Sequence, residues 1–191
     1  MTLNFPEIKD GLIPCMDTMK AICGDTRELS LIDLMCGFAP HTPKLGFKDR
    51  TYTDLIDRSL DIKSEQPFFT QQDVLQTPTN KYYDVAICSD GIEHLFERDG
   101  YKLLLIMNHI SDKHYIFTPT TGFGFANEGD LNPQQHRSTW TPDMLPGYAF
   151  VIFPKMHKQW KSGGFFAWTC RDIEKDFERV KDIIMQKDWA K

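Results

Sequence analysis

Leu31-Ile32-Asp33-Leu34-Met35-Cys36-Gly37-Phe38-Ala39-Pro40 joins an apolar run to an acidic residue and a turn of small residues. Apolar runs of this length that end at a glycine are typical of buried strands. A glycine at the end of a strand also lets a ligand approach the backbone closely. We therefore interpret residues 31–36 as a central strand that ends in a candidate ligand-binding turn.

The length and charge of the chain narrow the classes of protein to consider. A chain of 191 residues suits one α/β domain with some additional structure. Its net charge of −5 supplies no general attraction for a phosphate backbone, so we expect no duplex nucleic acid as a partner. No apolar run reaches the length of a membrane span and the N-terminus lacks a signal-peptide pattern, so neither a membrane partner nor secretion is expected.

The cysteines indicate a reducing compartment. They are odd in number and widely spaced, which is not the pattern of a disulfide framework. We interpret them as reduced thiols of a cytoplasmic protein: Cys15, Cys23, Cys36, Cys88 and Cys170. We expect this protein to be a monomer or a homodimer.

Apolar segments alternate with helical patterns, and this order predicts an α/β fold with a mostly parallel sheet. Tyr82 to Asp90 gives the clearest strand, an apolar run that ends in small polar and acidic residues. Helices are expected at 11–24, 98–112 and 171–191, and strands at 31–36, 51–55, 68–70, 82–90, 114–118, 148–153 and 164–168. A hairpin-like segment at 157–163 should make the last two strands antiparallel.

The predicted fold class is a Rossmann-like, doubly wound and mostly parallel seven-stranded sheet, with an antiparallel final strand pair and helices on both faces. A single domain covers residues 1–191. Within it, residues 1–30 are expected to form an N-terminal helical cover and residues 119–140 a lid-like loop without periodicity. Prolines and a glycine at 40–46 indicate that any crossover helix at 41–50 is short.

Acidic or small polar residues stand at four predicted strand ends: Asp33 with Gly37, Asp54, Asp73, and Ser89 with Asp90. The carboxyl ends of parallel strands meet at one edge of the sheet, where ligands bind. Asp54 follows Asp33 by 21 residues, which suits a carboxylate that binds two ribose hydroxyls. This edge is therefore a candidate nucleoside site. Aspartate is also common in turns, so an alternative role for Asp54 and Asp73 is simply to shape their own turns.

Residues 31–168 resemble a class I S-adenosylmethionine-dependent methyltransferase. Ile32 to Ala39 is similar to the family's first motif, an acid followed by alternating glycines, with Met35 and Ala39 standing where glycine is usual. Tyr83 to Leu95 resembles the fourth-strand motif and ends in Glu-His-Leu.

A third segment extends the resemblance toward the C-terminus. His136-Arg137-Ser138, followed by Trp140-Thr141-Pro142, resembles a segment that precedes the last strands in several small-molecule methyltransferases. The resemblance implies S-adenosyl-L-methionine as the cofactor, with Asp54 or, as an alternative, Asp57 on the ribose, and Asp73 on the adenine amino group. The implied cofactor-binding residues are Asp33, Cys36, Gly37, Asp54, Asp73, Val74, Ser89, Asp90 and His94. The implied acceptor-binding residues are His136, Arg137 and Trp140, and the implied catalytic residues are His136 and Asp90.

The catalytic groups have alternative interpretations. Methyl transfer needs an in-line nucleophile, and it needs a base only when the acceptor must lose a proton early. His136 is the candidate base because it stands in a non-periodic loop without an evident core role, but it could be an ordinary surface histidine. Arg137 could clamp an anionic acceptor or only hold its loop.

The sequence gives no metal motif. Glu93 and His94 could be simple helix-start residues. Neither His-Glu-x-x-His nor a paired Cys-x-x-Cys occurs, so no metal ligands are predicted.

The expected function is transfer of a methyl group from S-adenosylmethionine to a small organic or sugar-like acceptor, as O- or N-methylation. Cys88-Ser89-Asp90-Gly91 lacks the Asn-Pro-Pro-Tyr type of sequence, which disfavours N-methylation of nucleic acid bases. Aromatic residues near the predicted lid and last strands suit a small organic acceptor: Phe123, Phe125, Trp140, Phe153, Trp160, Phe165 and Phe166.

Two other classes of function compete. The first alternative rests on Met35 and Ala39, which stand where the family has glycine. With these substitutions the protein could bind S-adenosylmethionine as a catalytically inactive sensor or partner subunit. A nicotinamide-dependent oxidoreductase would share the layout, but the glycine pattern of the turn disfavours it.

Overall fold

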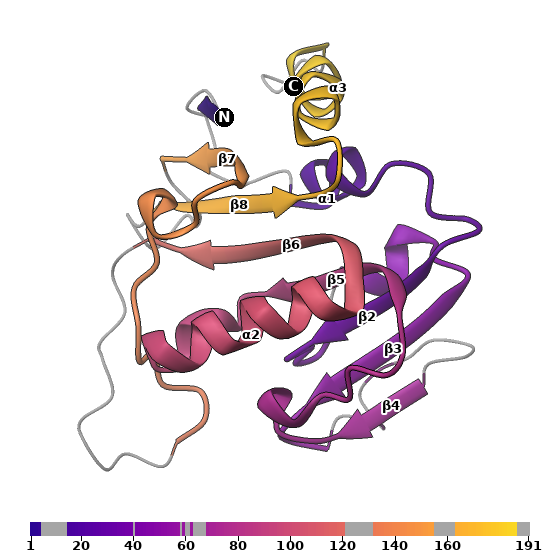
Figure 1. The fold of residues 1–191 in the computed structure, drawn as a ribbon, viewed down its shortest axis with the longest axis vertical. Helices are drawn as coiled ribbons and strands as arrows, with labels where there is room; N and C mark the ends of the chain where they lie inside the picture. Colours follow the sequence, from indigo (N-terminus) through magenta and orange to yellow (C-terminus); the bar gives the residue numbers. More distant parts are fainter. Residues whose placement is uncertain are drawn as a thin grey trace.

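The structure is a computed structural model that describes residues 1–4, 15–39, 41–57, 59, 62, 68–120, 132–154 and 163–186. In this part of the chain, eight strands form one sheet in the order β1-β7-β8-β6-β5-β2-β3-β4 (Figure 1). The strands are β1 (Thr2–Asn4), β2 (Ser30–Leu34), β3 (Asp49–Asp54), β4 (Phe68–Gln71), β5 (Tyr83–Ser89), β6 (Ser111–Pro119), β7 (Ala149–Phe153) and β8 (Gly164–Thr169). The helices are α1 (Cys15–Cys23), α2 (Glu97–Ile110) and α3 (Ile173–Gln186), and the short 3-10 helices are η1 (Thr42–Leu45), η2 (Val74–Gln76), η3 (Ile92–His94) and η4 (Pro142–Met144).

The directions of the strands confirm the predicted fold class. Strands β4, β3, β2, β5 and β6 lie side by side in this order and run parallel to one another. Strand β8 is antiparallel to both β6 and β7, which confirms the antiparallel final pair. The carboxyl ends of β2, β3, β4 and β5 therefore meet at one edge of the sheet.

Strand β5 shows why a central parallel strand is apolar throughout. Val85 and Ile87 pack into one hydrophobic cluster and Ala86 and Cys88 into another, on the opposite face. Both faces of the strand are buried, so both sets of alternating positions must be apolar. The two clusters hold the sheet between helices on both faces, as predicted.

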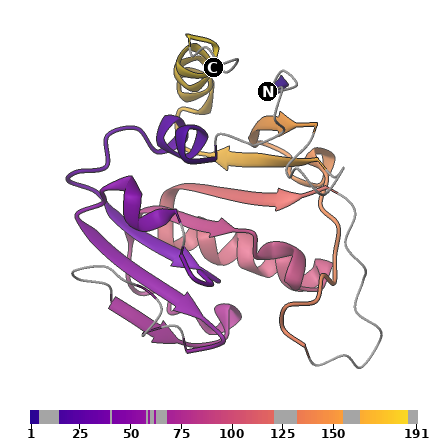
Figure 2. The same ribbon diagram turned by 180° about the vertical axis from the view of Figure 1, so that it is seen from behind.

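Helices α1 and α3 cover one face together. Figure 2 shows α1 in front of the sheet, near α3, with α2 behind the strands. The Arg179 guanidinium on α3 donates hydrogen bonds to the carbonyls of Ala21 and Ile22 on α1, at 2.7 and 3.1 Å. Because these carbonyls lie in the last turn of α1, Arg179 satisfies groups that the helix itself leaves unpaired. Gly24, with φ +74°, ends α1 as the sequence suggests.

Helix α2 covers the other face and ends earlier than predicted. Leu103, Met107 and Ile110 are buried against the sheet. The helix stops at Ile110, whereas the sequence suggested Asp112. Ser111 is already extended, its hydroxyl donates to the Met107 carbonyl at 2.9 Å, and it pairs with Tyr83 of β5. Pairing with β5 therefore begins directly after the helix.

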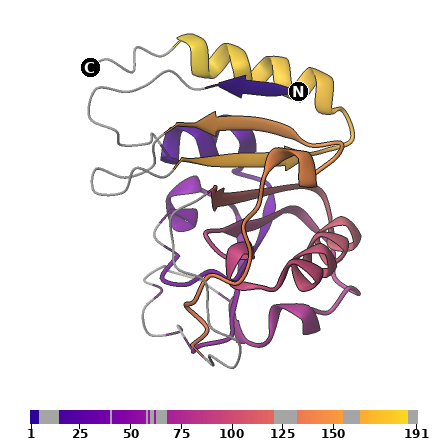
Figure 3. The same cartoon turned by 90° about the vertical axis from the view of Figure 1, so that its left-hand side faces the viewer.

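The sheet has one strand more than the seven predicted. Strand β1 runs parallel to β7, with Thr2 opposite Phe150, and the Phe150 N–H donates to the Met1 carbonyl at 2.9 Å. Three residues are too few to show a period in the sequence, so the prediction of a purely helical cover at 1–30 missed this strand. Seen from the side in Figure 3, β1 and α3 lie at the same end of the molecule.

Several predicted features lie wholly or partly outside the described residues. The hairpin-like segment 157–163 is described only at Gly163, and the lid-like loop 119–140 only at 119–120 and 132–140. Phe123, Phe125 and Trp160 are not described. None of the helices in the described ranges combines the length and the apolar character that crossing a bilayer requires.

Candidate functional site at the carboxyl edge of the sheet

The turn after β2 has the left-handed backbone that favours glycine, although only one of its three left-handed residues is a glycine. Met35, Gly37 and Ala39 have φ values of 58°, 52° and 43°. Left-handed backbone costs a residue with a side chain roughly 1–2 kcal/mol. The Cys36 N–H donates to the Thr53 carbonyl at 2.9 Å, and the Ala39 N–H donates to the Cys36 carbonyl at 2.7 Å. The turn therefore holds Met35 and Ala39 in the conformation that glycine would favour.

Asp33 is buried beneath η1 and does not line the pocket described below. It lies on the same face of β2 as Leu31, and its Oδ2 accepts a hydrogen bond from the Thr42 hydroxyl at 2.6 Å. Burial raises the pKa of Asp33 to about 7, with a smaller contribution from Asp54 and an opposing one from Thr42. In this arrangement Asp33 links β2 to η1.

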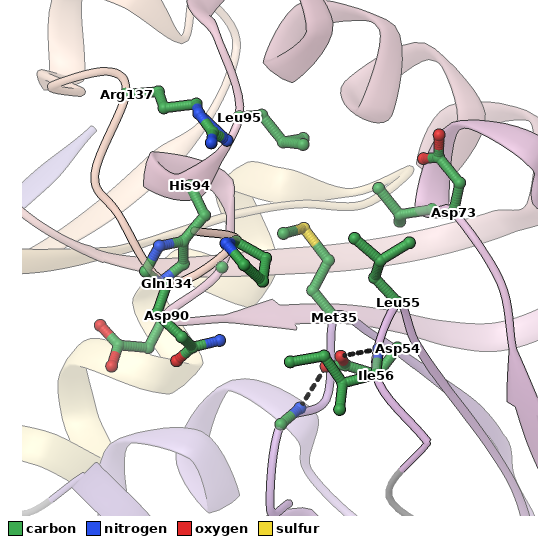
Figure 4. A pocket seen from close by; sticks show the side chains of 14 residues that line it. Met35, Asp54, Leu55, Ile56, Asp73, Asp90, His94, Leu95, Gln134 and Arg137 are labelled. Carbon is green, nitrogen blue, oxygen red and sulfur yellow. Dashed lines mark hydrogen bonds between the residues drawn. The ribbon is translucent and has the colours of Figure 1, made fainter. Parts of the chain in front are cut away.

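Asp54, at the end of β3, joins two neighbouring strand ends. Its carboxylate accepts the N–H groups of Gly37 at 2.8 Å and Ile56 at 2.9 Å, the two dashed bonds of Figure 4. Asp57 instead accepts the Ser59 N–H at 2.9 Å and does not line the pocket. Of the two candidates for the ribose, the structure brings Asp54 to the pocket.

Asp73 lines the same pocket and shapes its own turn. Its side chain accepts the Leu75 N–H at 2.9 Å and caps η2, and the buried Val74 follows it. The interpretation of Asp73 as a turn former is therefore correct, but it does not compete with a ligand role, because Asp73 also faces the pocket.

A pocket of about 150 Å³ opens between these strand ends and η3. Figure 4 shows Met35 near its centre, with Asp73, Leu55 and Asp54 on one side and Asp90, His94 and Arg137 on the other. Among the predicted site residues, the pocket contains Gly37, Asp54, Asp73, Val74, Asp90, His94 and Arg137. Prediction from the sequence missed the remaining lining residues, which are Met35, Leu55, Ile56, Gly91, Leu95, Pro133 and Gln134.

Glu93 is the most deeply buried acid at this edge. It is 1% exposed, and its Oε2 accepts the Thr118 hydroxyl at 3.0 Å. Its Oε1 has no hydrogen-bond partner among the described residues. Burial and the nearby Asp90 carboxylate raise the pKa of Glu93 well above its usual range. As the sequence allowed, Glu93 and His94 lie in a short helix, η3, but Glu93 points into the protein.

His94 and His136 meet beside Glu93. Their ring centroids are 4.8 Å apart and the rings are nearly perpendicular. His94 Nδ1 lies 3.2 Å from the Gln135 carbonyl oxygen. Burial lowers the pKa of His136, with a contribution from His94 that Asp90 opposes. One ligand atom from each of Glu93, His94 and His136 lies within 4.8 Å of the others, so these residues could hold a metal ion.

The segment that carries His136 is fixed to η3 by its backbone. The N–H groups of Arg137 and Ser138 donate to the Glu93 carbonyl at 2.7 and 3.1 Å. The Arg137 side chain donates to the Asn132 carbonyl at 3.2 Å and lies 5.5 Å from the centroid of the exposed Phe96 ring. Arg137 thus holds its own loop and also lines the pocket.

His136 is not among the residues that line the pocket, and neither are Trp140, Cys36 and Ser89. Trp140 is fully buried, donates from its indole N–H to the Ser138 hydroxyl at 2.9 Å, and packs against Gly100 of α2. Cys36 is buried in a small cluster behind the turn, and Ser89 is the last residue of β5. The described aromatic residues suggested for an acceptor are core side chains: Trp140, Phe153, Phe165 and Phe166.

Two signals in the sequence could have pointed to parts of this site. Met35 lies between Asp33 and Gly37, at a position where the family usually has glycine. A side chain at this position lies at the end of the strand, beside the expected ligand. The Glu-His pair at 93–94 was recognised as a motif, but its meeting with His136 depends on pairing across 43 residues that no local pattern encodes.

The structure is similar to several solved methyltransferases, all at low sequence identity. The N-methyltransferase NodS from Bradyrhizobium japonicum, in complex with S-adenosylhomocysteine, matches with a TM-score of 0.59 and 11% identity over 79% of this chain and 82% of that chain. Magnesium protoporphyrin IX methyltransferase from Synechocystis, with bound S-adenosylhomocysteine, matches with a TM-score of 0.55 and 13% identity over 81% of this chain and 80% of that chain.

A third match is the 1,6-didemethyltoxoflavin-N1-methyltransferase of Burkholderia thailandensis, with a TM-score of 0.52 and 14% identity over 81% of this chain and 78% of that chain. Neither the protein-family models nor the curated proteins gave a match. Together with the strand order and the pocket at the carboxyl edge, these likenesses show that the chain has the fold of the class I S-adenosylmethionine-dependent methyltransferases.

Proposed function

We propose that the protein binds S-adenosylmethionine at the carboxyl edge of the sheet and transfers its methyl group to a small acceptor. The observation that carries this proposal is the convergence of Gly37, Asp54, Asp73 and Asp90 from four strand ends on one pocket. A carboxylate such as that of Asp54 can accept two ribose hydroxyls, and Asp73 can accept the adenine amino group. NodS and the protoporphyrin methyltransferase, which share the fold, are described with S-adenosylhomocysteine bound.

The transfer itself is a displacement at carbon. An oxygen or nitrogen lone pair of the acceptor forms a bond to the methyl carbon, and the carbon–sulfur bond breaks with its electron pair moving to sulfur, which leaves S-adenosylhomocysteine. The acceptor's proton passes to a base, for which we propose His136 or Asp90. Much of the acceleration comes from holding nucleophile, methyl group and sulfur in line.

The proposed acceptor is a small organic or sugar-like molecule that enters from the side of η3. Arg137 lines the pocket on this side and lies over the exposed Phe96 ring, and the His136 ring lies against that of His94. A guanidinium beside an aromatic face can contact both an anionic group and a flat apolar surface. We further propose that the protein acts in the cytoplasm, where the thiols of Cys23, Cys36, Cys88 and Cys170 would stay reduced.

A second candidate is an inactive S-adenosylmethionine-binding sensor or partner subunit. The specific observation in its favour is that the Met35 side chain lines the pocket from a position where the family has glycine (Figure 4). A side chain there competes for space with the cofactor's amino-acid tail. Methyl transfer is preferred because this candidate gives no role to His94, which lines the pocket, or to His136, whose ring lies against that of His94.

The experiment compares the thermal midpoints with S-adenosylmethionine, S-adenosylhomocysteine, NAD and NADP, since a ligand of the native state raises the midpoint. We expect a shift with the two adenosyl compounds only. Incubation with radiolabelled S-adenosylmethionine and a panel of hydroxylated and amine metabolites then separates enzyme from sensor. Turnover that His136→Ala and Arg137→Ala leave unchanged would remove both from their proposed roles.

A further inference from the structure

We propose that Glu93, His94 and His136 bind one divalent transition-metal ion, of the Zn²⁺, Co²⁺ or Mn²⁺ type, at the wall of the pocket. One ligand atom from each residue lies within 4.8 Å of the other two. Two imidazoles and one carboxylate are a common ligand set for such ions when a coordination position is left open.

The buried Glu93 carboxylate gives the first independent argument for a cation. Glu93 is 1% exposed, and only one of its two carboxylate oxygens, Oε2, has a hydrogen-bond donor, the Thr118 hydroxyl. The other oxygen, Oε1, is buried and accepts no hydrogen bond from the described residues, and the Asp90 carboxylate lies close enough to Glu93 to raise its pKa further. Burying an unpaired carboxylate oxygen is costly. A cation between Glu93 and the histidines would supply the missing partner.

The orientation of His94 gives the second argument. Its Nδ1 lies 3.2 Å from the Gln135 carbonyl oxygen. In the tautomer that donates this hydrogen bond, the lone pair of Nε2 is available to a metal. Histidine ligands in metal sites commonly donate their other ring N–H to a carbonyl or carboxylate, which fixes the ring and raises its basicity.

The backbone holds the three ligands together before any ion arrives. The Arg137 and Ser138 N–H groups both donate to the Glu93 carbonyl, so the segment with His136 is fixed to the helix with Glu93 and His94. Bonds of about 2.0–2.2 Å place the ligand atoms of a tetrahedral ion about 3.3–3.6 Å apart. Side-chain rotations that close the cluster by about 1 Å are enough to reach this spacing.

The place of the cluster suggests what the ion does, and this step rests on the proposed function. His94 lines the pocket, so an acceptor hydroxyl bound there could take the open coordination position. A bound ion lowers the pKa of a coordinated hydroxyl, whose proton passes to Asp90 or to water as the oxygen attacks the methyl carbon. With the ion bound, His136 is a metal ligand, which leaves Asp90 as the base of the two residues proposed above.

The test uses the full chain without a histidine tag, freed of metal with a chelator and then titrated with Co²⁺ and, separately, Zn²⁺. Visible absorption of Co²⁺ and calorimetry with Zn²⁺ report binding without any need for activity. We expect one ion per chain. Glu93→Gln and His136→Gln should each weaken binding at least about tenfold, whereas His109→Gln, at an exposed position on α2, should leave it unchanged.

Two results would overturn the metal site: no Co²⁺ or Zn²⁺ bound at millimolar concentration, or binding that survives both Glu93→Gln and His136→Gln. Circular dichroism checks that the near-isosteric variants fold. A parallel titration with S-adenosylhomocysteine separates this proposal from the proposed function. If S-adenosylhomocysteine binds and the metal does not, only the proposed metal site is wrong. If the metal binds and S-adenosylhomocysteine does not, the metal site is supported and the proposed function is wrong.

Discussion

Met35 and Ala39 show that a turn can keep its path after losing the residues that favour it. Both have left-handed φ values, as Gly37 does, so the backbone after β2 follows the course that three glycines would give. Two hydrogen bonds to β3, from Cys36 to the Thr53 carbonyl and from Gly37 to the Asp54 carboxylate, fix this course together with the Ala39 bond inside the turn. The difference from the family pattern therefore lies in the side chains, above all in that of Met35, which lines the pocket.

Gly100 is a second residue whose small size the structure requires. A Cβ added at this position of α2 would lie 2.2 Å from a ring carbon of the buried Trp140. Gly100→Ala should therefore lower the free energy of unfolding by about 1–3 kcal/mol through overpacking, even though alanine favours helices by about 1 kcal/mol. Urea unfolding followed by circular dichroism measures this change.

Leu105→Ala is the matched control, because Leu105 lies on the same helix and is 60% exposed. Its unfolding free energy should change by no more than about 0.5 kcal/mol. A Gly100→Ala protein as stable as the wild type would show that Trp140 does not pack tightly there.

At the scale of elements, Asp73 joins a structural role to a proposed ligand role. Asp73→Ala removes the cap of η2 and should cost about 0.5–1 kcal/mol of stability. If Asp73 also accepts the adenine amino group, the affinity for S-adenosylhomocysteine should fall about 10- to 100-fold, since hydrogen bonds to charged groups contribute about 1.5–3 kcal/mol.

Asp73→Asn keeps a side-chain oxygen that can cap η2, so it serves as the comparison. Calorimetric titration of both variants gives the affinities and urea unfolding gives the stabilities. If Asp73→Ala bound S-adenosylhomocysteine as tightly as the wild type, Asp73 would be a turn former only.

Elements with a strong period could be predicted from the sequence, and elements set by tertiary pairing could not. β5 is apolar on both faces and α2 has regular apolar spacing, so their existence followed from local pattern. The end of α2 did not, because Ser111 leaves the helix in order to pair with Tyr83. Strand β1 has only three residues, and it is a strand because it pairs with β7.

The same division holds for the candidate site. Asp54 and Asp73 stand at strand ends that the sequence orders along one edge, and both line the pocket. Trp140 was predicted to bind the acceptor because of its neighbours in the sequence. In the structure its ring packs against Gly100 and is buried in the core. The cluster of Glu93, His94 and His136 depends on two backbone bonds from 137 and 138 to Glu93, which no spacing rule predicts.

For the whole molecule, the buried His114 makes stability depend on pH. His114 is 1% exposed and its Nε2 lies 2.6 Å from the Tyr148 hydroxyl. Burial lowers the pKa of His114 to about 4. The unfolded chain therefore takes up this proton below pH 6.5 while the native state does not, so the contribution of His114 to stability is full above pH 6.5 and is lost between pH 6.5 and 4. The loss reaches about 3 kcal/mol at most.

Urea unfolding at pH 7, 6, 5 and 4 measures this dependence in the wild type and in His114→Gln. The variant should lose less stability on acidification than the wild type. His109→Gln changes an exposed histidine on α2 and should keep the wild-type slope. Equal slopes in wild type and His114→Gln would show that His114 does not carry this dependence.

The central claim is that S-adenosylmethionine binds at the carboxyl edge of the sheet, and calorimetric titration with its product, S-adenosylhomocysteine, tests it most directly. We expect one site per chain, an affinity at least about tenfold lower for Asp54→Asn, and an unchanged affinity for Asp57→Asn. Asp57 is the matched control because it lies just beyond Asp54 but not in the pocket. No binding at millimolar concentration, or binding that Asp54→Asn leaves unchanged, would contradict the claim.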